Sequence, residues 1–205
     1  MWGLLLLLLL SGLPATALAQ PAPAPTDPAP AAPASPLRAG ASEITVGGGA
    51  AWGVEVFHSS TGHDFAFQTL SWGRVLTAPR GPGLLRGRLQ WAIEVMPVFG
   101  QYEPRKVYGV GVTPIVWRWN FDARGTVLPF VELGGGGLWT TEPVPERTIG
   151  SNFTAHLGAG IRWLPDRRHG LVLAYRFHHI SNGNRIERNP GINSHQAYVG
   201  WTWIR

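Results

Sequence analysis

Cysteine is absent from all 205 residues of this chain. The fold therefore has no disulfide framework, and thiolate chemistry and a lipidated cysteine at the mature terminus are excluded. Residues 41–205 also lack an apolar run of the ~20 residues that a transmembrane helix needs. They contain no calcium-binding cluster and no zinc-ligand spacing. We therefore expect no cofactor and no metal.

The longest apolar run, Leu4 to Leu10, lies near the N-terminus and is followed by Ala17-Leu-Ala19. This layout is typical of an export signal cleaved after Ala19, although no Lys or Arg precedes the leucines. An uncleaved anchor helix is the alternative, but the run is short for it. Residues 20–41 are mostly Pro, Ala and Ser. This composition cannot bury enough apolar surface to fold. We predict a signal peptide at 1–19, a disordered linker at 20–41 and one domain at 42–205.

The formal net charge of +5 and the pI near 10.4 suggest an anionic partner. Export, and arginines scattered rather than clustered with aromatics, argue against nucleic acid. A phosphate-bearing lipid surface fits the charge better, although ordinary solubility explains it equally well.

Several segments alternate apolar and polar residues, which is typical of membrane strands whose two faces meet different surroundings. In the clearest segment one face is formed by Leu89, Trp91, Ile93, Val95, Pro97 and Phe99. We predict strands at 43–54, 64–78, 86–101, 106–120, 126–139, 151–164, 170–181 and 193–204. An even number of strands places both termini in the periplasm. The predicted fold is all-β, an eight-stranded antiparallel up-and-down transmembrane β-barrel in the bacterial outer membrane.

A soluble β-sandwich or lipocalin-like barrel, with the apolar faces turned inward, has the same alternation. Tryptophans near the strand ends favour the membrane barrel, because aromatic girdles lie at bilayer interfaces. A barrel of eight strands is filled by side chains. Its inward charges must then pair with one another, since a lone buried charge costs several kcal/mol. These are Arg88, Glu94, Glu132, Arg162 and Arg176.

His179 and Ser181 share one face of the seventh predicted strand, because successive side chains alternate. They continue an apolar stripe that includes Tyr175 and Phe177, and Asn193 begins the neighbouring strand. We predict that Ser181 is a nucleophile, that His179 takes its proton and that Asn193 orients the imidazole.

The loop that follows has two further roles in this prediction. The backbone N–H groups of Asn182, Gly183 and Asn184 are candidates for an oxyanion hole. Arg185 and Arg188 are candidates for binding phosphates of the substrate, or are simple solubilising charges.

The segment His179-Ile-Ser181-Asn182, followed by Asn189-Pro-Gly191 and the last strand, resembles the lipid A 3-O-deacylase (PagL) family. The resemblance implies an outer-membrane barrel that hydrolyses the ester at position 3 of lipid A, without a metal, by a Ser, His and acid triad. It also implies lipopolysaccharide and outer-membrane lipids as partners, with Tyr175 and Phe177 beside the acyl chain. A homodimer is left open.

Asn193 stands where the best-known members of that family have glutamate, twelve residues after the serine. Its carbonyl can fix the tautomer of His179, but it brings no charge to stabilise the imidazolium. Glu187 and His195 are candidate helpers, and His178 should be a satisfied interior histidine. Two other functions remain open: a phospholipase-type lipid hydrolase, and a non-catalytic barrel that mediates adhesion or membrane integrity.

Overall fold

The protein was analysed as a computed structural model that describes residues 35–56, 58–123 and 125–205. The predicted signal peptide, and residues 20–34 of the predicted linker, lie outside the described residues.

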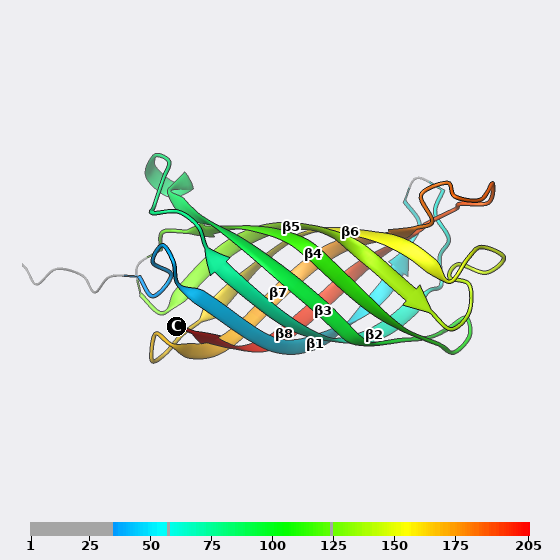
Figure 1. The fold of residues 1–205 in the computed structure, drawn as a ribbon, viewed down its shortest axis with the longest axis horizontal. Helices are drawn as coiled ribbons and strands as arrows, with labels where there is room; N and C mark the ends of the chain where they lie inside the picture. The colour runs from blue at the N-terminus through cyan, green and yellow to red at the C-terminus, as the bar shows by residue number, and fades with distance from the viewer. Residues whose placement is uncertain (1–34, 57, 124) are drawn as a thin grey trace, which may run out of the picture. The chain divides into compact units, whose positions relative to one another are not determined.

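Eight strands form one closed barrel in which each strand pairs with the next in sequence and the last pairs with the first (Figure 1). All neighbouring pairs are antiparallel. The strands are β1 (Ser42–Val54), β2 (Asp64–Val75), β3 (Gly87–Glu103), β4 (Val107–Phe121), β5 (Val127–Thr140), β6 (Ser151–Trp163), β7 (His169–Ser181) and β8 (Ile192–Ile204), and a short 3-10 helix, η1 (Gly83–Leu85), precedes β3. The predicted fold class is confirmed.

The two faces of the barrel wall differ as the alternation predicted. In β2, buried and exposed residues alternate along almost the whole strand. The outward residues include large apolar side chains that are half exposed, such as Leu70, Leu133 and Val199. Apolar surface of this kind is what a barrel presents to lipid. Among the residues that the structure describes, none forms a helix long and apolar enough to cross a membrane.

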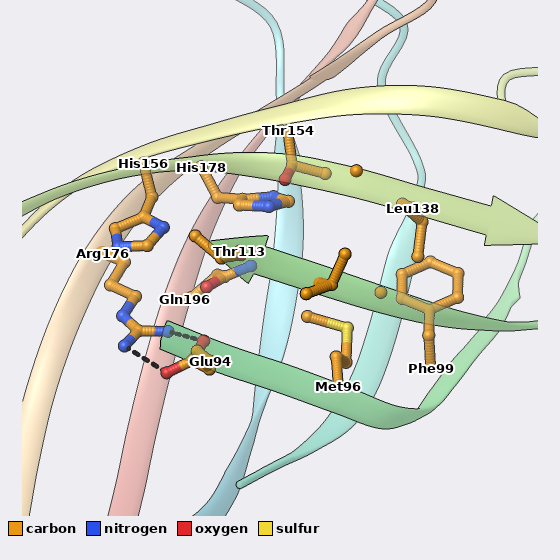
Figure 2. A pocket seen from close by; sticks show the side chains of 13 residues that line it. Glu94, Met96, Phe99, Thr113, Leu138, Thr154, His156, Arg176, His178 and Gln196 are labelled. Carbon is orange, nitrogen blue, oxygen red and sulfur yellow. Dashed lines mark hydrogen bonds and ion pairs between the residues drawn. The ribbon is translucent and has the colours of Figure 1, made fainter. Parts of the chain in front are cut away.

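Paired charges fill the middle of the barrel interior. Figure 2 shows Arg176 paired with Glu94. Arg176 donates to Glu94 from Nη1 and Nη2 at 2.9 and 3.0 Å, and to Glu132 from Nε at 2.6 Å. Arg162 contacts Glu43 through Nε at 2.5 Å. The prediction that inward charges pair is therefore correct for these residues.

Two members of this network were missing from the predicted set. Glu43 lies in β1 and accepts from Arg118 of β4, at 3.4 Å, as well as from Arg162. Arg118 also donates to Glu132 at 2.6 Å. Arg88, by contrast, pairs with Asp122 near the end of the barrel where β1 begins and β8 ends. Among the described residues, the negative charges of three carboxylates and the positive charges of three guanidinium groups thus neutralise one another in the middle of the barrel interior.

One predicted face is wrong. Phe99 was placed outward with Leu89 and Val95, but its exposed fraction is 1% and its ring lies 4.9 Å from that of Phe65 inside the barrel. The cause is a register shift between Met96 and Phe99 in the pairing of β3 with β4. A bulge of this kind inserts a residue and reverses the faces beyond it.

The packed part of the chain begins before the predicted boundary at residue 42. Leu37 and Ala41 are buried in an apolar cluster with Val75, Leu128, Leu164 and Ile204 at the end of the barrel. Gly40 N–H donates to the Val75 carbonyl at 2.8 Å. The last residues of the predicted linker are therefore part of the folded domain.

Candidate active site

The site lies at the end of the barrel where β7 ends and β8 begins, opposite the end where β1 begins (Figure 1). Along β7, Arg176, His178 and Ile180 are buried, whereas Tyr175 is 49% exposed on the outer face. His179 and Ser181 have the parity of Tyr175 and are partly exposed. The structure therefore turns both side chains toward the lipid side of the wall.

His179 and Asn193 are directly opposite each other in the β7–β8 ladder. His179 Nδ1 lies 2.8 Å from Asn193 Oδ1, and Asn193 Nδ2 donates to the Val56 carbonyl at 2.9 Å. Because a carbonyl only accepts, the Val56 contact fixes which end of the amide is Nδ2, so Oδ1 must accept from His179 Nδ1–H. This assignment leaves Nε2 with the lone pair, which is the tautomer a general base needs.

Ser181 is half-buried and lies two residues beyond His179 on the same face. Within the described part of the chain, Ser181 Oγ makes no hydrogen bond, to His179 or to any other residue. Hydrogen bonds between a nucleophile and its base are often long without substrate and shorten when substrate binds. The geometry thus brings the two groups to one face without joining them.

The loop from 182 to 191 is held by asparagine side chains. Asn182 N–H donates to Asn189 Oδ1 at 3.0 Å, and Asn189 Nδ2 donates to Asn184 Oδ1 at 2.9 Å. Gly183 and Asn184 have φ near +64° and +59°. Because the Asn182 N–H is already engaged, an oxyanion site in this loop would depend on Gly183 and Asn184.

Asn189 was not among the predicted site residues, although its side chain spans the turn that follows Ser181. The sequence signal was present in the Asn189-Pro-Gly191 segment. Gly191 itself has φ near +67°, and a Cβ there would lie 2.9 Å from Cε1 of His179. Glycine at this position therefore lets the loop pack directly against the imidazole.

The predicted substrate-binding arginines differ in their surroundings. Arg185 donates from Nε to the Asn182 carbonyl at 2.9 Å, donates from Nη2 to the Ser151 carbonyl and lies over the Phe153 ring. It therefore braces the loop against β6. Arg188 is exposed, and its side chain makes no contact with an acid among the residues described.

Of the two candidate helpers, neither contacts His179 in the described structure. His195 Nδ1 lies 2.5 Å from Tyr175 Oη, and its ring packs against Phe177. Glu187 is exposed in the loop and forms no ion pair with any described residue.

His178 faces the interior, as expected, but it is not satisfied there. Its exposed fraction is 4%, its ring packs against Phe65 and its Nδ1 has no hydrogen-bond partner in the described ranges. It lies on the same strand as His179, but its side chain points to the opposite face, so it takes no part in the outer-face site.

A family model described as "Lipid A 3-O-deacylase (PagL)" matches residues 47–202. The chain belongs to this family. Three solved structures are similar in fold: the outer membrane enzyme PagL (18% identity, TM-score 0.55, 77% of this chain and 97% of that one), Neisserial surface protein A (13%, 0.57, 80% and 98%) and OprG from Pseudomonas aeruginosa (8%, 0.53, 82% and 97%). No curated protein matches the chain significantly.

The family and these barrels place the chain in the bacterial outer membrane. The fold alone does not assign an activity, because only the first of these three proteins is described as an enzyme. Within the part of the chain that the structure describes, no three His, Asp or Glu side chains gather as metal ligands. The site holds Asn193 in the position where the resemblance implied an acid.

Proposed function

We propose that the protein is an outer-membrane esterase that removes the 3-O-linked acyl chain from lipid A. Family membership supports the substrate and the reaction class. The observation that carries the mechanism is the His179–Asn193 contact of 2.8 Å on the lipid side of the wall, with Ser181 on the same face.

In the proposed reaction, Ser181 Oγ attacks the ester carbonyl carbon while His179 Nε2 takes the hydroxyl proton. The carbonyl oxygen becomes an oxyanion, which the N–H groups of Gly183 and Asn184 can stabilise. The intermediate collapses to an acyl-enzyme as the sugar oxygen departs, and His179 gives its proton to that oxygen. A water molecule, deprotonated by His179, then attacks the acyl carbon; the bond to Ser181 Oγ breaks, His179 returns the proton to Ser181 Oγ, and the fatty acid is released.

The place of the site suits a substrate that never leaves the membrane. Lipid A occupies the outer leaflet, so it reaches the barrel wall by lateral diffusion. Tyr175 and Phe177 continue an apolar surface below His179, where an acyl chain would lie. Arg188 is exposed and makes no ion pair with any described residue, so in this proposal it binds a phosphate of the lipid. The pairing of two barrels stays a prediction.

Ser181→Ala tests the proposal. Purified variant and wild-type barrels in detergent would be incubated with lipopolysaccharide and, separately, with phospholipid micelles, and released fatty acids would be measured by mass spectrometry. We expect the wild-type protein to release a fatty acid from lipopolysaccharide and the variant to release none.

A heat-dependent shift on gels would show that both barrels are folded. Release that is unchanged in Ser181→Ala removes the serine from its assigned role. Release from phospholipid alone would identify a phospholipase instead, and release from neither substrate by wild-type protein would favour a non-catalytic barrel.

A further inference from the structure

The excess positive charge of this chain is not at the candidate active site. The loops at that end carry the acids Glu55, Asp64, Glu103, Glu142, Glu146 and Glu187 and the bases Arg105, Lys106, Arg147, Arg185 and Arg188. Acids therefore exceed bases by one at the site end. The interior is balanced, with three carboxylates and three guanidinium groups.

The other end of the barrel, where β1 begins and β8 ends, is strongly basic. Its described residues include Arg38, Arg74, Arg80, Arg86, Arg88, Arg167, Arg168 and Arg205, against Asp122 and Asp166. An excess of six positive charges on one rim, with near neutrality elsewhere, is a charge asymmetry rather than general solubilising charge. The anionic partner that the net charge suggests therefore belongs at this rim.

Four of these arginines line one groove. Arg38, Arg168 and Arg205 line an open groove of about 770 Å³ together with Ser35, Pro36, Asp166, Arg167 and Ile204. In the described part of the chain, no carboxylate forms an ion pair with Arg38, Arg168 or Arg205. The arginines that line the groove outnumber its aspartate, Asp166, so they repel one another, and a bound anion relieves that repulsion.

Asp166 also lines the groove, but it forms no ion pair with Arg38, Arg168 or Arg205 in the described structure. Its carboxylate lies 2.7 Å from His169 Nδ1 and accepts from the backbone N–H groups of Arg168 and His169 at 2.9 and 2.6 Å. The His169 side chain and these backbone donors lower the pKa of Asp166 to about 2. The carboxylate is thus committed to the turn that presents Arg168.

The backbone of the groove is fixed before any ligand binds. Ile204 N–H donates to the Arg168 carbonyl at 2.7 Å, and Arg205 exchanges backbone hydrogen bonds with Ser42. Leu37 is 1% exposed and anchors the segment that carries Arg38. The backbone that carries the three guanidinium groups is therefore held in place, which lowers the entropy lost on binding.

The position of the groove along the barrel axis, relative to the membrane, indicates the partner. Trp163 and Trp201 are 47% and 43% exposed on the outer wall near the same end, and Ile204 lies in the groove itself. Exposed tryptophans mark the level at which the bilayer meets water, so the rim just beyond them faces the phosphate layer. We propose that Arg38, Arg168 and Arg205 form a binding site for the phosphate headgroups of anionic phospholipids in the leaflet opposite the active site.

This proposal goes beyond the proposed function and shares with it only the orientation of the barrel. Guanidinium groups bind phosphate oxygens through paired N–H donors. Each basic side chain near an anionic membrane surface contributes about a fivefold gain in affinity. Removing three should therefore weaken binding about a hundredfold.

The test uses the mature protein in detergent, titrated with phosphatidylglycerol or with phosphatidylcholine and followed by native mass spectrometry. The test variant carries Arg38→Gln, Arg168→Gln and Arg205→Gln. A matched control carries three neutralised bases at the site end, Arg105→Gln, Lys106→Gln and Arg147→Gln. Both remove three positive charges, so they separate the position of the charge from its amount.

We expect wild type and control to prefer phosphatidylglycerol and to lose that preference in 1 M salt, whereas the test variant binds both lipids equally. The proposal is overturned if wild type binds phosphatidylglycerol and phosphatidylcholine equally. It is also overturned if the control loses its preference for phosphatidylglycerol as completely as the test variant does. Retention of soluble acidic glycan by wild type in place of phosphatidylglycerol also overturns it. Fatty-acid release from lipopolysaccharide in the same samples should be unchanged by the test variant, which keeps this outcome separate from the proposed function.

Discussion

Asn193→Ala removes the oxygen to which His179 Nδ1–H donates, and it tests whether an uncharged residue can serve as the third member of the site. In the structure this contact is 2.8 Å long, and Asn193 is 5% exposed and held by the Val56 carbonyl. Without it, the imidazole proton is shared between the two ring nitrogens and the ring is free to turn. General base catalysis contributes about 10²- to 10⁴-fold, so we expect kcat to fall by about 10²-fold.

Asn193→Asp should act in the opposite direction on the reaction. A hydrogen bond to a charged acceptor is worth about 1 kcal/mol more than a neutral one, which corresponds to about a fivefold to tenfold increase in kcat when the imidazolium forms. The same change removes the donor to the Val56 carbonyl and turns a carboxylate toward it. Stability should therefore fall by about 1–3 kcal/mol.

The assay is the rate of fatty-acid release from lipopolysaccharide in detergent, with unfolding in urea measured on the same preparations. Val199→Ala is a suitable control, because Val199 is 50% exposed on the outer face of the same strand and touches neither His179 nor Asn193 in the ladder. Activity of Asn193→Ala within twofold of wild type would refute the assigned role of the asparagine. A loss of activity in both Asn193→Ala and Asn193→Asp would show that Asn193 acts through the position of the loop rather than through the imidazole.

Three further outcomes follow from single contacts. Asn189→Ala should lower kcat about tenfold with little change in KM, because the turn after the nucleophile loses its brace; equal kinetics would assign Asn189 to stability alone. Arg176→Met should destabilise the barrel by about 3–5 kcal/mol, measured by urea unfolding, because Glu94 is left buried without its partner. Asp166, held by His169, should titrate near pH 2 in NMR rather than near 3.8; its stabilising contribution is present above the unfolded pKa and is lost as the pH falls through about 2.

The strands and the facing of the site were predictable because both follow from a period of two. Once Tyr175 and Phe177 were read as outward, His179 and Ser181 had to follow them, and nothing beyond the strand itself was needed. The position of Asn193 opposite His179 also followed, because the loop between β7 and β8 is short and the strands are antiparallel neighbours.

What escaped prediction depends on contacts between distant segments. The Asn182 N–H was free in the sequence reading, but Asn189 folds back seven residues to accept from it. Likewise, no pattern in the sequence shows that Glu43 of the first strand meets Arg162 of the sixth. The location of the excess positive charge could not be predicted without the barrel either. Successive loops lie at opposite ends of a barrel, and this arrangement is what separates Arg38 and Arg205 from the loops around the site.

The reversed face of β3 gives the sharpest test of the structure itself. If the alternation continued unbroken from Leu89, Phe99 would face lipid and Val98 would face the interior. The bulge reverses this: Phe99 is 1% exposed and packs on Phe65, whereas Val98 is 47% exposed. Truncation of a buried Phe to Ala costs about 3–5 kcal/mol, since it leaves a cavity. Substitution of an outward residue costs about 0.5 kcal/mol or less.

We therefore expect Phe99→Ala to unfold at much lower urea concentration than wild type in lipid vesicles, and Val98→Ala to unfold close to wild type. The two substitutions are adjacent in sequence, so general effects on the strand are shared, and the difference between them measures which side chain is inside. A larger loss for Val98→Ala than for Phe99→Ala would mean that the register shift between Met96 and Phe99 is absent and that the simple alternation holds through the strand.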